Sequence, residues 1–234
     1  MARQPTSPIG RQRGLSLVEL LIGSALGVLL VGAGIGVLLA QLKESRALAE
    51  HNRLIQDLRS TTSLIARDLR RAGHWADSGA GVWLRDAPPP DRTVAANPYA
   101  AVDTTPAPAG ALTLRYSRDS VENHSVDSNE QFGFRLRNEA IEMRIGGANW
   151  QTMTDASLMK VTALEFTPSE ATIDLGALCS AGCAADDMAC PPRQKLRSVI
   201  VTIAARSAAD ASAVRTARAE VRLRNDEITG RCPI

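Results

Sequence analysis

The feature that most constrains the fold of this chain is a long apolar stretch near its N-terminus. Residues 14–42 read GLSLVELLIGSALGVLLVGAGIGVLLAQL, and their only ionisable side chain is Glu19. The uncharged run from Leu20 to Leu42 would span about 35 Å as a helix at roughly 1.5 Å per residue, and a bilayer core is about 30 Å thick. A short leader with three arginines precedes it. We therefore expect a membrane-spanning N-terminal helix, with the rest of the chain outside the membrane.

Glu19 is the informative charge in this stretch. A carboxylate inside an apolar segment costs a few kcal/mol on insertion, so it is a functional candidate and needs a partner. The small-residue junction Gly14-Leu15 precedes the apolar run, whereas the cleavage site of a secretory signal peptide follows it. Cleavage there would create an α-ammonium group four residues from Glu19, and that amine, its own or a neighbour's, is the expected partner. An uncleaved signal anchor is the alternative.

The junction GLSLVELLI resembles the class III leader junction of type IV pilins and type II secretion pseudopilins. In that family a prepilin peptidase cuts after the glycine and N-methylates the new first residue. The resemblance implies that residues 1–14 are a prepilin leader, that Gly14 precedes the cut and that Leu15 becomes the methylated N-terminus. It also implies a pilin fold and a role for Glu19 in filament assembly. Many members have phenylalanine where this chain has Leu15.

The helical pattern continues beyond Leu42 and becomes amphipathic. One face carries apolar side chains at helical spacing: Leu48, Ile55, Leu58, Ile65 and Leu69. No proline interrupts residues 15–72, and Gly73 is a plausible stop. We predict one helix of about 50 to 58 residues, in which 15–42 form the transmembrane or filament-core half and 43–72 pack on a folded domain. The five glycines of the first half permit close helix approach, or are simply common in membrane helices.

Residues 73–110 have a different composition from the helix before them. They contain six prolines and many alanines and glycines, which is typical of a long connecting loop. Trp75 and Trp83 are expected to hold this loop against the domain, because a large apolar ring is rarely left free. A structural connector is the favoured interpretation, and a partner-binding surface is the alternative.

From residue 111 to residue 234 the hydrophobic period is two, which predicts strands. Alternating or β-branched runs occupy residues 111–117, 132–137, 140–145, 161–167, 198–205 and 219–225. Strands grouped after one helix favour an α+β domain, with the long helix packed on a mainly antiparallel sheet. Residues 118–131 between two of these runs are polar, and we expect them to form an exposed loop.

Four cysteines lie in the last quarter of the chain: Cys179, Cys183, Cys190 and Cys232. In a periplasmic domain two disulfides are expected, and three pairings are possible. The alternative is a zinc site, although the spacing C-x3-C-x6-C has no histidine cluster beside it. Asp186 and Asp187 are adjacent carboxylates without the ligand spacing of a calcium site, so no metal and no cofactor are expected.

The segment from Phe132 to Phe166 and the final strands resemble the minor pilins called PilW. The matching features are Val161, Leu164 and Phe166 in one strand and the closing pair Arg224-Asn225. This resemblance implies a minor type IV pilin that primes pilus assembly near the pilus tip. The implied partners are prepilin peptidase, other minor pilins, the major pilin and the inner-membrane assembly platform. The implied location is the inner membrane, with the domain in the periplasm, and then the extracellular filament.

Two functions are alternatives to a minor type IV pilin. A J-like minor pseudopilin of a type II secretion system would share the anchor and the general fold. A membrane-anchored periplasmic enzyme is disfavoured, because the sequence has no G-x-S-x-G motif, phosphate-binding glycine loop or His-x-x-x-His pair. The formal charge of +2 becomes −1 once the three leader arginines are subtracted (2 − 3 = −1), so nucleic-acid binding is not predicted.

Overall fold

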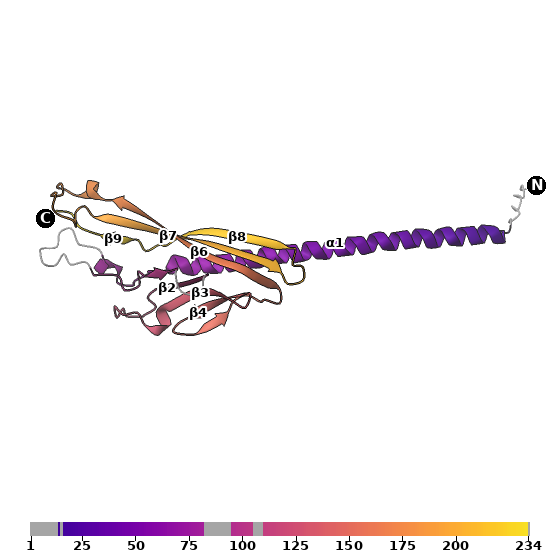
Figure 1. Ribbon diagram of the computed structural model, residues 1–234, viewed down its shortest axis with the longest axis horizontal. Coiled ribbons are helices and arrows are strands. Elements are labelled where there is room, and N and C mark those ends of the chain that lie inside the picture. The colour runs from indigo at the N-terminus through magenta and orange to yellow at the C-terminus, as the bar shows by residue number, and fades with distance from the viewer. Residues whose placement is uncertain (1–13, 15, 82–94, 105–109, 234) are drawn as a thin grey trace, which may run out of the picture. The chain divides into compact units, whose positions relative to one another are not determined.

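The computed structural model describes residue 14 and residues 16–81, 95–104 and 110–233 (Figure 1). The chain divides into two compact units, one up to Ala49 and the other from Glu50 onwards. The predicted Trp83 anchor lies outside the described residues.

A single helix, α1, runs from Leu17 to Arg71 and is 55 residues long, which confirms the predicted long helix. Gly73 follows its end with a φ of +74°, a left-handed conformation that suits glycine and commonly terminates helices. Asn225 donates a side-chain hydrogen bond to the carbonyl of Ala72 at 3.0 Å, so one carbonyl at the helix end has a partner from a distant segment. The sequence predicted the stop but not the role of Asn225.

The second unit contains two antiparallel sheets rather than the single sheet that the sequence predicted (Figure 1). The first has the order β1(Val102–Asp103), β2(Ala111–Arg115), β3(Gln131–Arg137), β4(Ala140–Ile145), β5(Trp150–Thr152). The second has the order β6(Met159–Asp174), β7(Arg193–Ser207), β8(Val214–Arg222), and β9(Glu227–Thr229) also pairs with β7. The short helices are η1(Ser78–Gly81), η2(Ser128–Glu130) and η3(Gly176–Leu178).

The strongest strand predictions are confirmed. The β-branched run 198–205 lies in β7, which is the central strand between β6 and β8. Strands β3 and β4 form the predicted hairpin, and its two turn residues Asn138 and Glu139 have φ values of 52° and 59°, as a tight two-residue turn requires. The short strands β1, β5 and β9 were not predicted, because two or three residues carry too little alternation to be read as a strand.

Within the second unit, α1 and both sheets share one hydrophobic core. The helix contributes Leu54, Leu58, Ile65, Ala66, Leu69 and Ala72, and the sheets contribute residues such as Leu112, Phe134, Ile141, Val161, Val201, Ile203 and Val221. Two predictions about buried residues were wrong. Leu48 is 58% exposed and lies in the first unit. Glu130, placed by sequence in an exposed loop, is fully buried.

The buried face of α1 gives a direct test of this core. Leu69 is fully buried in α1, whereas Leu64 in the same helix is 46% exposed. We expect Leu69→Ala to lower the free energy of unfolding by about 2–5 kcal/mol, because it removes buried methyl groups and leaves a cavity. The matched control Leu64→Ala is expected to change it by no more than about 0.5 kcal/mol. Denaturant unfolding of the full chain in detergent micelles measures both, and equal losses would contradict the described core.

Candidate functional site

The first described turn of α1 places Glu19 by local rules. The backbone N–H of Leu20 donates to the carbonyl of Ser16 at 3.1 Å, so Ser16 occupies the N-cap position of the helix. Glu19 is then the third helical residue, and Ser-x-x-Glu is the sequence pattern of a capping box. A carboxylate in the first turn is also favoured by the helix dipole. Glu19 therefore has a local structural reason for its position, beside the assembly role expected from sequence.

The predicted processing junction is only partly described. Gly14 is exposed, and Leu15 lies outside the described residues. The distance between the predicted amine of Leu15 and the carboxylate of Glu19 is therefore not defined by the structure. Cleavage after Gly14, methylation of Leu15 and the pairing of that amine with Glu19 stay predictions.

The apolar half of α1 is bare in the first unit. Fifteen large hydrophobic side chains between Leu17 and Leu42 are each 51–76% exposed. An uninterrupted apolar surface of this size does not occur on a soluble monomer without a partner or a lipid phase to cover it. Among the described residues, α1 is the one helix that is long and apolar enough to cross a membrane.

The glycines of this half have no packing role within the described chain. A Cβ atom added at Gly23, Gly27, Gly32, Gly34 or Gly36 would meet nothing within 4 Å beyond the local helix. Their small size therefore leaves smooth strips on the helix surface, without serving a contact in the described part of the protein. Both explanations from sequence, close approach of another helix and ordinary membrane composition, remain compatible with this surface.

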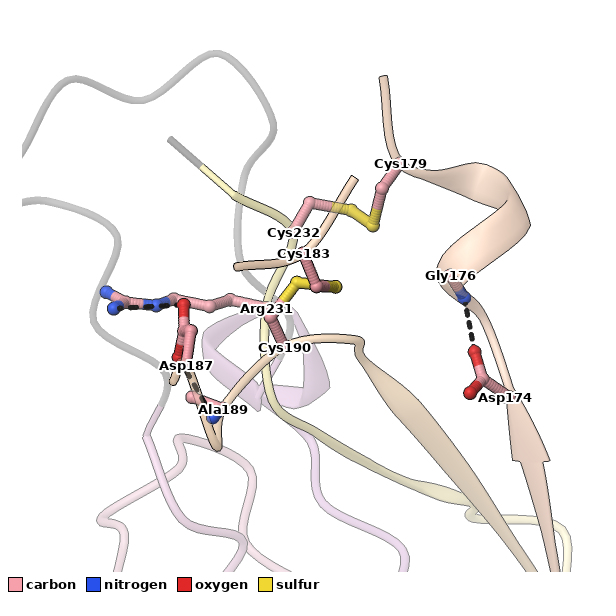
Figure 2. The surroundings of a disulfide bond; sticks show 9 residues. All are labelled: Asp174, Gly176, Cys179, Cys183, Asp187, Ala189, Cys190, Arg231 and Cys232. Carbon is pink, nitrogen blue, oxygen red and sulfur yellow. Dashed lines mark hydrogen bonds and ion pairs between the residues drawn. A yellow bond between two sulfur atoms is a disulfide. The ribbon is translucent and has the colours of Figure 1, made fainter. Parts of the chain in front are cut away.

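The four cysteines form two disulfides, one within the loop between β6 and β7 and one between that loop and the C-terminal segment (Figure 2). Cys179 pairs with Cys232 across 53 residues, and Cys183 pairs with Cys190 across 7 residues. This resolves the pairing that the sequence left open. The sulfurs are used in covalent bonds, so they do not serve as zinc ligands.

Backbone contacts hold the cysteine loop against the C-terminal segment. The N–H of Arg231 donates to the carbonyl of Ala189 at 2.7 Å. Gly230 has a φ of +81°, and a Cβ there would lie 2.5 Å from the same carbonyl, so only glycine fits. Asp187, weighed above as a calcium ligand, lies 3.8 Å from the guanidinium of Arg231 and accepts the N–H of Ala189 at 3.0 Å. These contacts account for its position without a metal.

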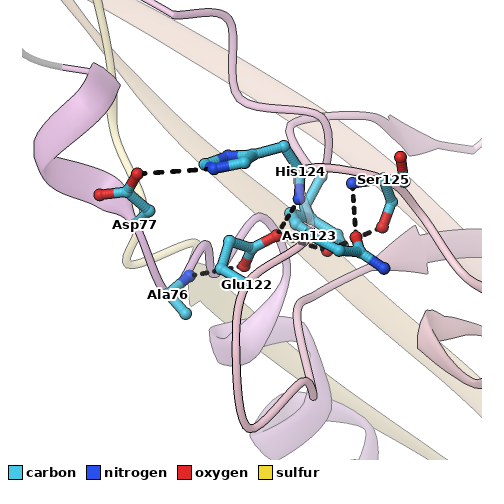
Figure 3. A network of polar contacts seen from close by, with 7 residues as sticks. Ala76, Asp77, Glu122, Asn123, His124 and Ser125 are labelled. Atoms are coloured by element: carbon cyan, nitrogen blue, oxygen red, sulfur yellow. Dashed lines mark hydrogen bonds and ion pairs between the residues drawn. The ribbon is translucent and has the colours of Figure 1, made fainter.

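A cluster of polar contacts joins the segment after α1 to the loop between β2 and β3 (Figure 3). The sequence did not predict this cluster. Glu122 accepts the N–H of Ala76 at 3.3 Å and the N–H of His124 at 2.9 Å. The His124 ring packs edge-on against Trp75 at 5.7 Å between centroids and lies 3.8 Å from Asp77. Trp75 is buried, as expected for an anchor of this segment. The sequence signal was weak because all these residues lie in loops.

The two disulfides are expected to differ in their effect on stability. In the loop-entropy model, removing a bridge across 53 residues costs about 4 kcal/mol and removing one across 7 residues costs about 2.5 kcal/mol. The double variant Cys179→Ser, Cys232→Ser should therefore lower the free energy of unfolding more than Cys183→Ser, Cys190→Ser. Denaturant unfolding of both variants and the wild type in micelles makes the comparison. A larger loss for the short bridge would contradict this prediction.

Comparison with known proteins assigns the family. The family model described as prepilin peptidase-dependent protein B matches residues 47–223, which is more than half of the chain. No curated protein and no solved structure matches the chain. The matched range covers the second half of α1 and the strands β1 to β8, and it excludes the junction at Gly14. This chain therefore belongs to the prepilin peptidase-dependent protein B family, a type IV pilus-related family.

Proposed function

We propose that this protein is a minor type IV pilin of the kind called PilW, which primes pilus assembly and lies near the pilus tip. The observation that carries the proposal is that two separate parts of the chain indicate the same class. The junction and apolar run at residues 14–42 resemble a prepilin N-terminus, and the family match covers residues 47–223. The two segments share no residue, so a chance likeness in one would not produce the other.

In this proposal the protein is first stored in the inner membrane, with the second unit in the periplasm. Prepilin peptidase removes residues 1–14 and methylates Leu15, and the inner-membrane assembly platform then passes the subunit into a filament. Residues 15–42 pack there among the helices of other minor pilins and the major pilin, and residues 43–72 support the folded domain. The bare apolar surface of α1 supports this sequence of events, because it can be covered either by lipid or by neighbouring helices.

The proposed role of Glu19 is to select the register of docking. In the apolar filament core, its carboxylate and the α-ammonium group of Leu15 would each be costly alone, and together they form a desolvated ion pair. A subunit docked in the wrong register leaves one charge without its partner. Removing one member of such a pair costs about 3–5 kcal/mol, and every 1.4 kcal/mol is about tenfold in an equilibrium constant.

The N-terminus of the mature protein tests the processing step. We expect mass spectrometry of protein isolated from membranes to show N-methylated Leu15 as the first residue. In cells lacking prepilin peptidase the same measurement should show the uncleaved leader. The proposal does not require that a Gly14→Ala variant has its mature N-terminus at residue 15. An uncleaved wild-type chain in the presence of the peptidase would overturn the proposal.

The charge of Glu19 can be separated from its position in the capping pattern. Glu19→Gln keeps a side chain that suits the third position of a capping box, whereas Glu19→Ala does not. We expect both variants to be processed normally and both to fall by at least about tenfold in incorporation into pili, because both leave the α-ammonium group unpaired. Quantitative immunoblotting of sheared pili gives the readout.

Two outcomes of that experiment contradict the proposal. Normal incorporation of Glu19→Gln together with loss for Glu19→Ala would assign Glu19 to helix capping instead of charge pairing. Recovery of the wild-type protein from a type II secretion pseudopilus, and not from pili, would assign the chain to the J-like pseudopilins.

A further inference from the structure

The loop between β2 and β3 contains a buried negative charge. Glu130 is fully buried, and its carboxylate accepts the backbone N–H of Arg118 at 2.7 Å and the backbone N–H of Asp127 at 2.9 Å. Both donors are neutral, so they solvate the carboxylate without cancelling its charge. These hydrogen bonds favour the charged form, and a nearby cation would stabilise it further.

Tyr99 does not supply enough protons for the acceptors around it. Its hydroxyl oxygen lies 3.1 Å from Glu130 Oε2, 3.1 Å from Glu122 Oε1 and 3.0 Å from the carbonyl of Ser125. A tyrosine hydroxyl has one proton to donate, so two of these three oxygen contacts lack a proton. Burial and the neighbouring carboxylates Glu122 and Glu130 accordingly raise the pKa of Tyr99. The cluster has more acceptors than donors.

Two further polar atoms in the cluster are buried without a hydrogen bond. The Oδ2 atom of Asp119 is buried and accepts no hydrogen bond from the described residues. Ser117 is only 6% exposed, and its hydroxyl faces Tyr99 and Glu122 without a hydrogen bond of normal geometry to either. Leaving such a group unsatisfied costs about 1–3 kcal/mol, so a further partner at either atom would be stabilising.

No cationic side chain in the described part of the protein compensates these carboxylates. The ion pairs of this part of the chain involve none of Asp119, Glu122, Asp127 and Glu130. The same loop has two basic residues. The Arg118 guanidinium lies over the Phe132 ring at 5.8 Å, and His124 lies against Asp77.

The spacing of the carboxylates is compatible with one shared hard cation. One oxygen atom from each of Asp119, Asp127 and Glu130 lies within 4.8 Å of the others. Calcium binds oxygen at about 2.3–2.6 Å in flexible geometry, so ligand oxygens up to about 5 Å apart can share one ion, whereas magnesium demands near-ideal octahedral geometry. The ligand atoms are all oxygens. Hard cations such as calcium prefer oxygen ligands, whereas zinc does not require them. We propose that Asp119, Asp127 and Glu130 bind a calcium ion.

Such an ion would fix the β2–β3 loop to the segment that follows α1. Tyr99 contacts Glu130 and Glu122. Glu122 also accepts the N–H of Ala76 (Figure 3), so the cluster connects three separate stretches of the chain. Neutralising the cluster would remove the repulsion among its carboxylates and tighten this connection. The site is independent of the junction at Gly14 and of the proposed function.

The experiment uses the full chain in detergent micelles after metal is removed with a chelator. Terbium is the first probe, because it replaces calcium and emits when a nearby tyrosine is excited, and Tyr99 lies 3.1 Å from a proposed ligand. We expect terbium emission that calcium displaces, with a calcium Kd on the order of 10⁻⁴–10⁻³ M, as in extracellular modules. Calcium at ten times Kd should raise Tm by about 3–5 °C, and magnesium at the same concentration should raise it less.

Variants then assign the effect to the site. Asp119→Asn, at a partly exposed position, should weaken calcium binding by at least about tenfold and remove the tyrosine-sensitised emission. If that variant does not fold, Asp127→Asn at an exposed position serves the same purpose. The matched control is Asp186→Asn in the cysteine loop, which should bind as the wild type does.

Three results would overturn the proposal. The first is a wild-type protein without a calcium-dependent rise in Tm, and the second is Asp119→Asn with unchanged calcium affinity. The third is a metal-free protein whose Tm rises in acid or with Asp119→Asn and does not change when calcium is added. That result would show that a proton, and not an ion, compensates the buried carboxylates.

Discussion

The exposed apolar surface of α1 is the constraint on which the rest of this protein depends. Fifteen large hydrophobic side chains between Leu17 and Leu42 find no cover within the first unit. At about 25 cal/mol per Å² of apolar area, water is an unfavourable surrounding for such a surface, so lipid or other helices have to supply the cover. In the proposed function the same requirement gives Glu19 its role, because an apolar surrounding would make one carboxylate expensive and its pairing selective.

The second unit provides a hydrophobic core for the rest of the helix. From Leu54 onwards α1 presents an apolar face to two antiparallel sheets, and the end of the helix is tied to later strands by backbone and side-chain bonds. Arg197 on β7 extends this connection, since its guanidinium donates to the carbonyls of Ala100 and Asn225. The C-terminal part of a helix whose N-terminal part is apolar and exposed is thereby anchored in a folded body by many separate contacts.

Sequence reasoning predicted the elements that have a strong period and missed those that depend on distant contacts. The long helix, the hairpin at Asn138 and the central strand β7 follow from spacing and turn chemistry. The division into two sheets, the role of Asn225 and the cysteine pairing depend on which strands meet, and local pattern does not contain that information. Glu130 is the clearest case, because a glutamate in a polar segment indicates an exposed loop, and only the meeting of Tyr99, Arg118 and Asp127 around it explains its burial.

The longer disulfide has a mechanical consequence. Cys179 and Cys232 enclose β7, β8 and β9 in one covalent loop, and β7 is the strand with which β6, β8 and β9 pair. A pulling force applied at Cys232 passes through the sulfur bridge to Cys179 and reaches β6 directly. The enclosed strands then carry no tension along their own backbone, so they cannot be peeled off one after another from that end. A protein built this way resists traction at its C-terminal end through a covalent bond, and its sheet is left to resist only forces that arrive through β6.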